Sequence, residues 1–253
     1  MEEKIIYKSE KFNLCGLLSR RNDNDSIIVL CHGYLGDKNE TGLFDMLKIK
    51  LIEDNLNSFR FDFRAHGESS GNDEDISLTG EIKDLENTLD MLKTKGFNKF
   101  ILVGSSLGGA IVSLINHDKY NILNMIIWYG ALDFEKIKKG DFTKENMEIA
   151  KKSGYYIKYS KHNNNYRKIS YQLFEDFNTY KPYVNLQKLD LPILLIHGTK
   201  DELVNYESSI NTHKLCKNSK LIIIDGSKHL FMDSIENRNY AINETVSFIK
   251  EHI

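Results

Sequence analysis

The feature that most constrains the fold of this chain is an apolar run followed by a glycine-flanked serine at residues 101–109. Residues 104–108 read G-S-S-L-G, and the apolar segment after them has helical character. A G-x-S-x-G pattern between a strand and a helix is typical of a sharp turn that exposes a serine hydroxyl at the edge of a sheet. The glycines on either side of Ser106 allow the strand and the helix to approach closely, where a β-carbon would obstruct the turn. An ordinary tight turn with an incidental serine is the alternative.

The rest of the chain alternates between apolar runs of strand length and segments of helical periodicity. Strands are expected at residues 5–7, 14–18, 26–31, 58–63, 101–104, 125–129, 191–196 and 220–224. Helices are expected near residues 42–54, 78–94, 110–115, 206–216 and 236–251. This alternation predicts an α/β fold with a mostly parallel sheet and helices on both faces. Functional residues are then expected at the carboxyl ends of the strands.

The size and charge of the chain limit its class. Its 253 residues suffice for one large α/β domain. The formal net charge of −2 gives no electrostatic reason to expect nucleic acid or an anionic membrane as partner. The 3 cysteines form no disulfide framework or zinc spacing, which is typical of a reducing compartment. No signal-peptide core and no apolar run near the ~18 residues of a spanning helix is found, so we expect a cytoplasmic protein without a membrane span.

Three residues could form a nucleophile, a base and an orienting acid. A serine hydroxyl needs a base to accept its proton and a third group to orient that base. In this architecture the order along the chain is Ser, then Asp or Glu, then His. Asp201 and His229 follow the last two expected strands, so we predict a triad of Ser106, Asp201 and His229. Glu202 competes with Asp201, but Val204 suits an apolar anchor of the loop after the acid at 201. A turn-forming Asp201 and an ordinary loop histidine are the alternatives.

A negatively charged tetrahedral intermediate also needs hydrogen-bond donors. The backbone N–H of Leu107, at the start of the helix, is one expected donor, because helix N-termini favour negative charge. The backbone N–H of Tyr34, in the loop after the strand at 26–31, is the other. His32 and His66 have no carboxylate or cysteine at metal-ligand spacing, so we predict no metal and no cofactor, and expect both rings to bond to nearby loops.

Five motifs together resemble the α/β-hydrolases, in the serine-hydrolase group that contains bacterial cinnamoyl and feruloyl esterases, monoglyceride lipases and serine aminopeptidase-like relatives. They read H-G-Y-L-G-D-K at 32–38, R-F-D-F-R-A-H-G-E-S-S-G at 60–71, G-S-S-L-G-G at 104–109, H-G-T-K-D-E-L-V at 197–204 and D-G-S-K-H-L-F at 225–231. In that family the second motif position lends its N–H to the oxyanion hole, which supports Tyr34. The resemblance implies an α/β-hydrolase fold, and residues 57–84 are most similar to the cinnamoyl-esterase branch.

Residues 131–188 interrupt the alternation and are rich in charge, asparagine and aromatic rings. In the family that the chain resembles, the equivalent insertion forms a lid over the site. We therefore expect a single domain over 1–253 with a cap insertion at about 131–188. The aromatic side chains of this segment either clamp an aromatic or acyl group or form the segment's own small core.

Two positions depart from the cinnamoyl-esterase pattern. The residue before the nucleophile is usually histidine in that branch and is Ser105 here. The residue after it is often glutamine there and is Leu107 here, which leaves its N–H unaffected and makes the pocket wall more apolar.

The sequence as a whole predicts a carboxylic ester hydrolase that forms an acyl-enzyme on small to medium or aromatic acyl esters. A small-molecule ester is therefore the expected partner. A monoglyceride lipase and a peptidase-like amide hydrolase are alternatives within the enzyme class. A non-catalytic ligand-binding protein on the same scaffold is the alternative outside it.

Overall fold

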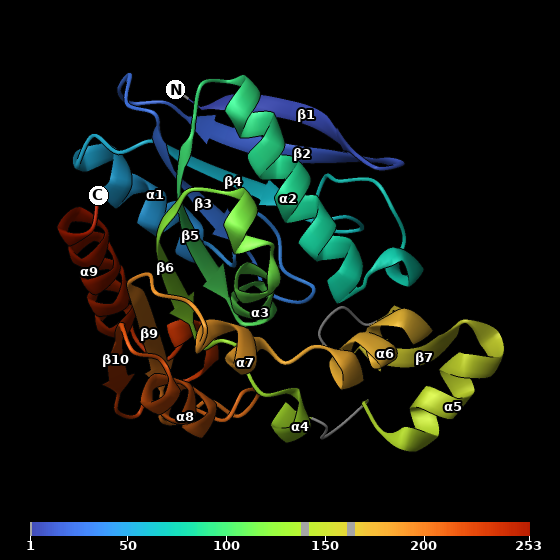
Figure 1. Ribbon diagram of the computed structural model, residues 1–253. Coiled ribbons are helices and arrows are strands. Elements are labelled where there is room, and N and C mark those ends of the chain that lie inside the picture. Colours follow the sequence, from blue (N-terminus) through green and yellow to red (C-terminus); the bar gives the residue numbers. More distant parts are fainter. Residues whose placement is uncertain (1, 138–141, 161–164) are drawn as a thin grey trace.

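A computed structural model describes residues 2–137, 142–160 and 165–253 of the chain (Figure 1). The strands of its main sheet are β1 (Glu3–Ser9), β2 (Phe12–Ser19), β3 (Ser26–Cys31), β4 (Ser58–Asp62), β5 (Lys99–Ser105), β6 (Ile122–Trp128), β9 (Ile193–Gly198) and β10 (Ser219–Ile224). The helices that cover it are α1 (Leu43–Glu53), α2 (Leu78–Thr94), α3 (Leu107–Leu114), α8 (Glu207–Leu215) and α9 (Ile235–Glu251).

The main sheet is mostly parallel. Its strand order is β1-β2-β4-β3-β5-β6-β9-β10. β2 runs antiparallel to both β1 and β4, and each pair from β4 to β10 is parallel. The carboxyl ends of β3, β5, β6, β9 and β10 therefore meet at one edge. The predicted α/β fold and its mostly parallel sheet are confirmed.

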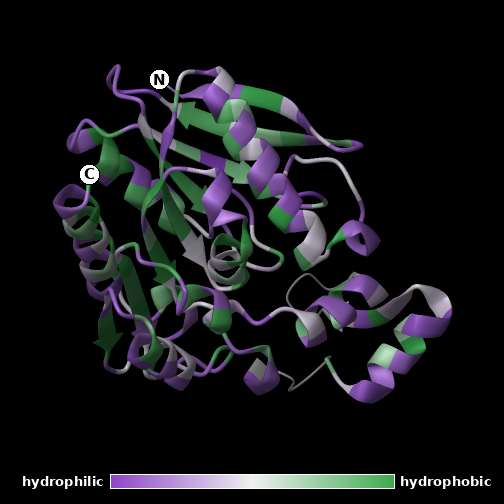
Figure 2. Cartoon of the chain, in the orientation of Figure 1, coloured by the Kyte–Doolittle hydropathy of each residue, from purple (hydrophilic) through white to green (hydrophobic). Residues whose placement is uncertain are grey.

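The central strands are apolar along their whole length because helices cover both faces of the sheet. Along β3, Ile27 and Val29 pack with the apolar side chains of α2 and α3. Ile28 and Leu30 point to the other face, where α1 and α9 contribute the core. In Figure 2 the central strands are mostly hydrophobic, whereas the helices carry mixed colours. Each strand is buried on both sides, which explains its unbroken apolar sequence.

The segment between β6 and β9 lies beside the main sheet (Figure 1). Its described elements are α4 (Phe134–Ile137), α5 (Lys144–Ser153), β7 (Tyr155–Ser160), β8 (Asn165–Ser170), α6 (Tyr171–Thr179) and α7 (Pro182–Leu186). β7 and β8 form a separate antiparallel pair. The sequence predicted an irregular insertion here but none of these elements. Residues 138–141 and 161–164 of the expected cap lie outside the described residues.

The phenylalanines of this segment pack on one another. The rings of Phe134 and Phe177 are stacked with centroids 4.4 Å apart, and the Phe142 ring lies 4.5 Å from Phe177 and 5.3 Å from Phe174. Phe174 and Phe177 are buried. These rings pack on one another and join the cluster of buried residues on one face of the main sheet. Tyr159 and Tyr166, also in this segment, are exposed.

No helix among the described residues is long and apolar enough to cross a membrane.

Candidate active site

The turn between β5 and α3 has the strained geometry expected of a serine that is raised above a sheet. Ser106 has φ 51° and ψ −115°, a backbone conformation that non-glycine residues rarely adopt. A β-carbon on Gly104 would lie 2.5 Å from the backbone oxygen of Gly108. A β-carbon on Gly108 would lie 2.2 Å from the oxygen of Cys31 at the end of β3. Only glycine therefore allows α3 to approach both strands, as the sequence predicted.

The loop after β3 lies directly against Ser106. A β-carbon on Gly33 would be 3.0 Å from the Ser106 Cβ. The backbone that carries Tyr34 therefore runs beside the serine. Leu107 is the first residue of α3, and the N–H groups in the first turn of a helix have no acceptor within that helix. The two predicted oxyanion donors thus come from segments that border the same serine.

Asp201 and His229 form a buried hydrogen-bonded pair. Nδ1 of His229 lies 2.6 Å from Oδ2 of Asp201, and the side chain of Asp201 is 0% exposed. Because the carboxylate can only accept, Nδ1 carries the proton and Nε2 of the neutral ring is an acceptor. Oδ1 of Asp201 accepts from the backbone N–H groups of Leu203 and Val204, both at 2.9 Å. The predicted acid and base are therefore brought together, and the neighbouring Glu202 is exposed.

The loops that carry this pair are joined by further contacts. The hydroxyl of Thr199 donates to Asp225 at 3.0 Å and accepts from the N–H of Gly226 at 2.8 Å. A β-carbon on Gly198 would lie 2.2 Å from the backbone oxygen of Ser227. The loops after β9 and β10 are thus in close contact, and this contact fixes the position of His229 relative to Asp201.

A second imidazole contacts the same carboxylate. Nε2 of His197 lies 3.2 Å from Oδ2 of Asp201 and 3.0 Å from the oxygen of Val204. Its Nδ1 lies 2.7 Å from the hydroxyl of Ser209, which donates when Nε2 carries the proton. Burial is the largest influence on the pKa of Asp201 and acts to raise it, but the hydrogen bonds from His197 and His229 outweigh it and lower that pKa. The carboxylate is therefore held in its ionised form.

The sequence did not assign this role to His197. The available signal was its position four residues before Asp201 in H-G-T-K-D, at the end of the same strand.

The segment after β6 contacts both Ser106 and His229. The N–H of Ser106 donates to Trp128 at 2.9 Å, and the N–H of Ala131 donates to the oxygen of Ser106 at 2.9 Å. Between these two contacts, the ring of Tyr129 packs on the ring of His229 with centroids 4.5 Å apart. Among the hydrogen bonds of the described residues, none joins the Ser106 hydroxyl to His229 directly. In enzymes without substrate such contacts are often long.

His32 and His66 brace the loops around the site, as expected. The N–H of Phe63 donates to Nε2 of His32 at 3.1 Å, and Nδ1 of His32 donates to Gly33 at 2.8 Å. The N–H of Leu35 likewise donates to Nε2 of His66 at 3.2 Å. Burial lowers the pKa of both rings, so they are neutral. Both nitrogens of His32 are thus engaged by backbone groups, which leaves none for a metal.

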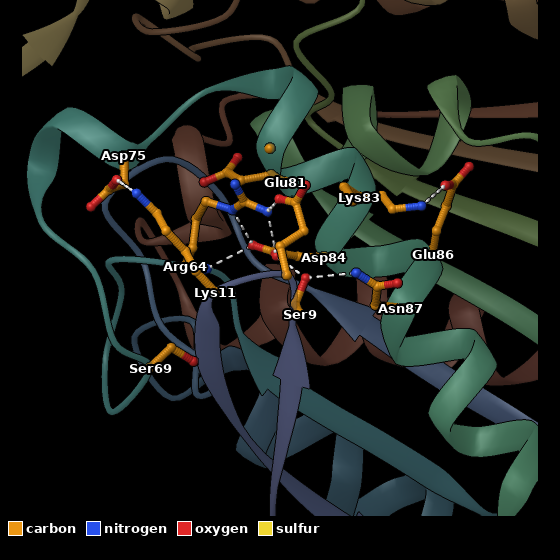
Figure 3. A network of polar contacts seen from close by, with 12 residues as sticks. Ser9, Lys11, Arg64, Ser69, Asp75, Glu81, Lys83, Asp84, Glu86 and Asn87 are labelled. Atoms are coloured by element: carbon orange, nitrogen blue, oxygen red, sulfur yellow. Dashed lines mark hydrogen bonds and ion pairs between the residues drawn. The ribbon is translucent and has the colours of Figure 1, made fainter.

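A buried ion pair supports the segment that carries His66 (Figure 3). Asp84 on α2 accepts three hydrogen bonds from Arg64, through its backbone N–H and Nε at 2.9 Å and Nη2 at 2.8 Å. The same carboxylate accepts from the hydroxyl of Ser9 at 2.5 Å. Glu81 lies beside them, with its Oε1 3.6 Å from Nδ1 of His66, and burial raises its pKa well above the usual range. Arg64 and Asp84 are nearly inaccessible to solvent, so removal of Arg64 would leave the Asp84 charge buried without its ion-pair partner. Without Asp84, the guanidinium of Arg64 would keep only Glu10 among the described residues, at 2.8 Å.

One group of residues has the composition of a cation site. Cys15, Asp62 and Glu68 bring possible ligand atoms within 4.8 Å of one another. The ammonium of Lys38 already lies between the two carboxylates, 2.7 Å from Asp62 and 2.9 Å from Glu68. This lysine supplies the positive charge that a metal would otherwise bring.

The chain is similar to known families of hydrolases. Residues 22–172, more than half of the chain, match the family described as serine aminopeptidase, S33. The chain belongs to this family of α/β hydrolases. A second family, described as alpha/beta hydrolase fold, matches residues 128–234. As a member, the chain carries the hydrolase architecture that its motifs suggested.

The curated relatives of this family member are distant. Human monoacylglycerol lipase ABHD6 is 20% identical, with 87% of this chain and 74% of that protein covered. Human serine hydrolase BPHL is 28% identical, with 82% and 74% covered. The uncharacterized protein YfhR of Escherichia coli K12 is 26% identical, and the match spans 62% of its length.

Solved structures confirm the fold. Est1E from Butyrivibrio proteoclasticus with bound ferulic acid has a TM-score of 0.82 at 22% identity, and the match covers 97% of this chain and 99% of that one. Mouse alpha/beta hydrolase domain-containing protein 10 has a TM-score of 0.77 at 21% identity, with 99% of both chains covered.

Proposed function

We propose that this family member is a carboxylic ester hydrolase in which Ser106, His229 and Asp201 act as nucleophile, base and orienting acid. The observation that carries the proposal is the 2.6 Å contact between Asp201 and His229 at the sheet edge where Ser106 borders Gly33. Relatives named as esterases and lipases support ester cleavage, and cytoplasmic residence remains part of the proposal.

The reaction would follow from the positions of these groups. Nε2 of His229 accepts the proton of the Ser106 hydroxyl as Oγ attacks the ester carbonyl. The N–H groups of Tyr34 and Leu107 hold the oxyanion of the tetrahedral intermediate. Its collapse breaks the bond to the alcohol, which leaves with the proton from His229. Water, deprotonated by the same ring, then attacks the acyl carbonyl. The bond between the acyl carbon and Oγ of Ser106 breaks, the ring returns the proton to Oγ, and the acid leaves.

The side chain of Asp201 contributes without leaving its ionised form. It holds Nδ1 of His229 and stabilises the imidazolium that forms when Nε2 takes the proton. Residues 131–188 would form a cap over this site, and no cofactor or metal enters the scheme. For substrates we favour small to medium acyl or aromatic esters, on the basis of the cinnamoyl-esterase motifs and the structural similarity to Est1E.

The first test is the hydrolysis of p-nitrophenyl esters from acetate to decanoate, together with methyl ferulate. We expect Ser106→Ala to lose roughly 10³- to 10⁶-fold in kcat on every ester that the wild type cleaves. Ser247→Ala, which removes an exposed hydroxyl on α9, serves as the matched control and should keep full activity. Wild-type turnover in Ser106→Ala would refute the mechanism, and a ligand recovered intact from the wild type would favour the binding-protein alternative.

A lipase for longer acyl chains is the second candidate. Apolar side chains are exposed on the loops that carry the acid and the base and at the start of α9: Leu203 is 69% exposed, Met232 56% and Ile235 54%. Such side chains suit an extended alkyl chain. A rise in kcat/KM from butyrate to decanoate would support this candidate, whereas a preference for acetate, butyrate or ferulate would support the first. An amide of the same acyl group, compared with its ester, tests the peptidase-like alternative.

A further inference from the structure

A buried carboxyl group lies inside the loop that borders Ser106. The side chain of Glu40 is 3% exposed and turns back into residues 33–40. Its Oε1 accepts from the backbone N–H of Gly33 at 3.2 Å. Its Oε2 lies 2.5 Å from the position that a β-carbon of Gly36 would occupy. The loop is therefore wrapped around this carboxyl group, and Gly36 has no room for a side chain because of it.

The same carboxyl group also reaches the strand that carries the nucleophile. The hydroxyl of Ser105, the last residue of β5, donates to Oε1 of Glu40 across 65 positions of sequence. Ser105 is 0% exposed and directly precedes Ser106. Oε1 of Glu40 thus joins two segments of the proposed site. One is the loop that carries the Tyr34 N–H, and the other is the end of β5, which is followed by Ser106 and Leu107. Ser105 is also the position where the cinnamoyl-esterase branch usually has histidine.

The backbone at Glu40 is strained. Glu40 has φ 45° and the following Thr41 has φ 53°, values in the left-handed region. Glycine adopts such values without cost, whereas a residue with a β-carbon does not. Glu40 thus occupies a conformation that its β-carbon disfavours, while its side chain accepts hydrogen bonds from Gly33 and Ser105.

We infer that Glu40 is a positioning residue, which holds the Gly33–Tyr34 backbone at the distance from Ser106 and Leu107 that an oxyanion requires. Its carboxyl group acts through two donors, the Gly33 N–H and the Ser105 hydroxyl, and touches no substrate atom. The inference rests on the proposed ester hydrolysis. Oxyanion donors contribute in the transition state more than in substrate binding, so a displaced loop should reduce kcat and leave KM nearly unchanged.

The experiment compares Glu40→Ala, Glu40→Gln and Ser105→Ala on p-nitrophenyl butyrate. Glu40→Ala removes the shared acceptor, and we expect roughly a 10- to 100-fold loss of kcat with less than about a threefold change in KM. Glu40→Gln keeps an acceptor oxygen and should restore most of kcat. Ser105→Ala should lose a smaller factor, and adding it to Glu40→Ala should cause no further loss, because both act through one oxygen.

Binding of an aryl trifluoromethyl ketone gives a readout that a general loss of stability would not produce. Addition of Ser106 turns its carbonyl into an oxyanion, so its inhibition constant should rise by the same factor as kcat falls. Titration with a fluorophosphonate gives the concentration of sites that still react. Because kcat is calculated per reactive site, misfolded protein does not lower it. Glu53→Ala, an exposed glutamate at the end of α1, is the control and should match the wild type.

Unchanged kcat in folded Glu40→Ala, or a KM that rises as much as kcat falls, would overturn the inference. If Glu40→Ala does not fold, unchanged kcat and ketone affinity in Ser105→Ala would overturn it in the same way. Failure of the proposed function looks different, because the wild type would then cleave no ester and react with no fluorophosphonate.

Discussion

Asp201 and Glu202 are neighbours with the same charge and opposite surroundings. Asp201 is enclosed by two imidazoles and two backbone N–H groups, whereas Glu202 is exposed. The four donors stabilise the ionised carboxylate at a depth where an unpaired charge would be very costly. Burial and donor geometry thus distinguish the two carboxylates at the scale of single residues, and they support Asp201 as the proposed acid.

Replacing this carboxylate with an amide tests its assignment. We expect Asp201→Asn to lower kcat on p-nitrophenyl butyrate by roughly 10²- to 10⁴-fold, since an amide no longer imposes the tautomer with Nε2 as acceptor. Glu202→Gln is the matched control, with an expected change of less than about twofold. Equal losses in the two variants would contradict the assignment of Asp201.

Glu40 should also make stability depend on pH. Burial, opposed by the donors Ser105 and Gly33 and assisted by the charge of Asp37, raises its pKa to about 7. The titratable groups facing it in the described chain include neutral His32 and Tyr129, whose own pKa is raised by burial and by Glu40. A carboxyl group whose pKa is higher in the folded state than in the unfolded state stabilises the fold at a pH below its unfolded-state pKa. That stabilisation is lost as the pH rises through its folded-state pKa.

We therefore expect the wild type to lose roughly 3 kcal/mol of unfolding free energy between about pH 4.5 and 7 through this one group. Glu40→Gln cannot ionise and should lack this loss. Urea denaturation of both proteins at pH 5 and pH 8 measures the difference. Parallel pH curves for the two proteins would show that Glu40 does not titrate in this range.

At the scale of elements, glycines decide how closely α3 approaches the sheet. Gly108 faces the backbone at the end of β3, whereas nothing lies within 4 Å of a β-carbon on Gly42, before α1. Gly42 has a positive φ of 81°, so a substitution there meets backbone strain alone. A comparison of Gly108 with Gly42 therefore separates the cost of steric crowding from the cost of a left-handed backbone conformation.

Gly108→Ala should cost roughly 3 kcal/mol or more of unfolding free energy, because its β-carbon meets backbone atoms that cannot move aside. Gly42→Ala should cost roughly 1 kcal/mol, from its left-handed conformation. Denaturant titration measures both, and ester turnover should fall only in Gly108→Ala. Similar costs in the two variants would argue against the close approach of α3 to β3.

At the scale of the whole molecule, the segment between β6 and β9 is attached to the sheet-covering helices at defined points. Asp176 on α6 is buried and accepts from both the N–H and the hydroxyl of Thr79 on α2, each at 2.9 Å. The phenylalanines of the segment also join the cluster of buried residues on one face of the main sheet. Loss of the polar attachment at Asp176 should open the segment locally before the main sheet unfolds.

Asp176→Ala should therefore raise trypsin cleavage within residues 131–188 by roughly tenfold, while the denaturation midpoint of the main sheet changes little. Glu175→Ala, its neighbour on α6, is the control and should leave the cleavage rate unchanged. Mass spectrometry of the fragments locates the cuts. Cleavage spread evenly over the chain would indicate global destabilisation instead.

The positions of the residues in the proposed site could be predicted from sequence because their signals are local. The apolar run and glycines around Ser106 specify a strand, a turn and a helix through sterics and burial within a few residues. Parallel pairing then carries the ends of β9 and β10 to the edge where Ser106 lies, so Asp201 and His229 followed from chain order.

The tertiary structure alone decided the partners of these residues. His197 shares the carboxylate of Asp201, Glu40 turns back to Ser105, and the phenylalanines around Phe177 pack on one another. Each contact depends on how loops and helices meet in space, which no short window of sequence contains. The sequence by itself determined the alternation of strands and helices along the main sheet and the polar residues at the strand ends, since burial and backbone sterics act locally. Which polar groups share a proton or an acceptor was settled only by folding, because hydrogen bonds require positions within about 3 Å.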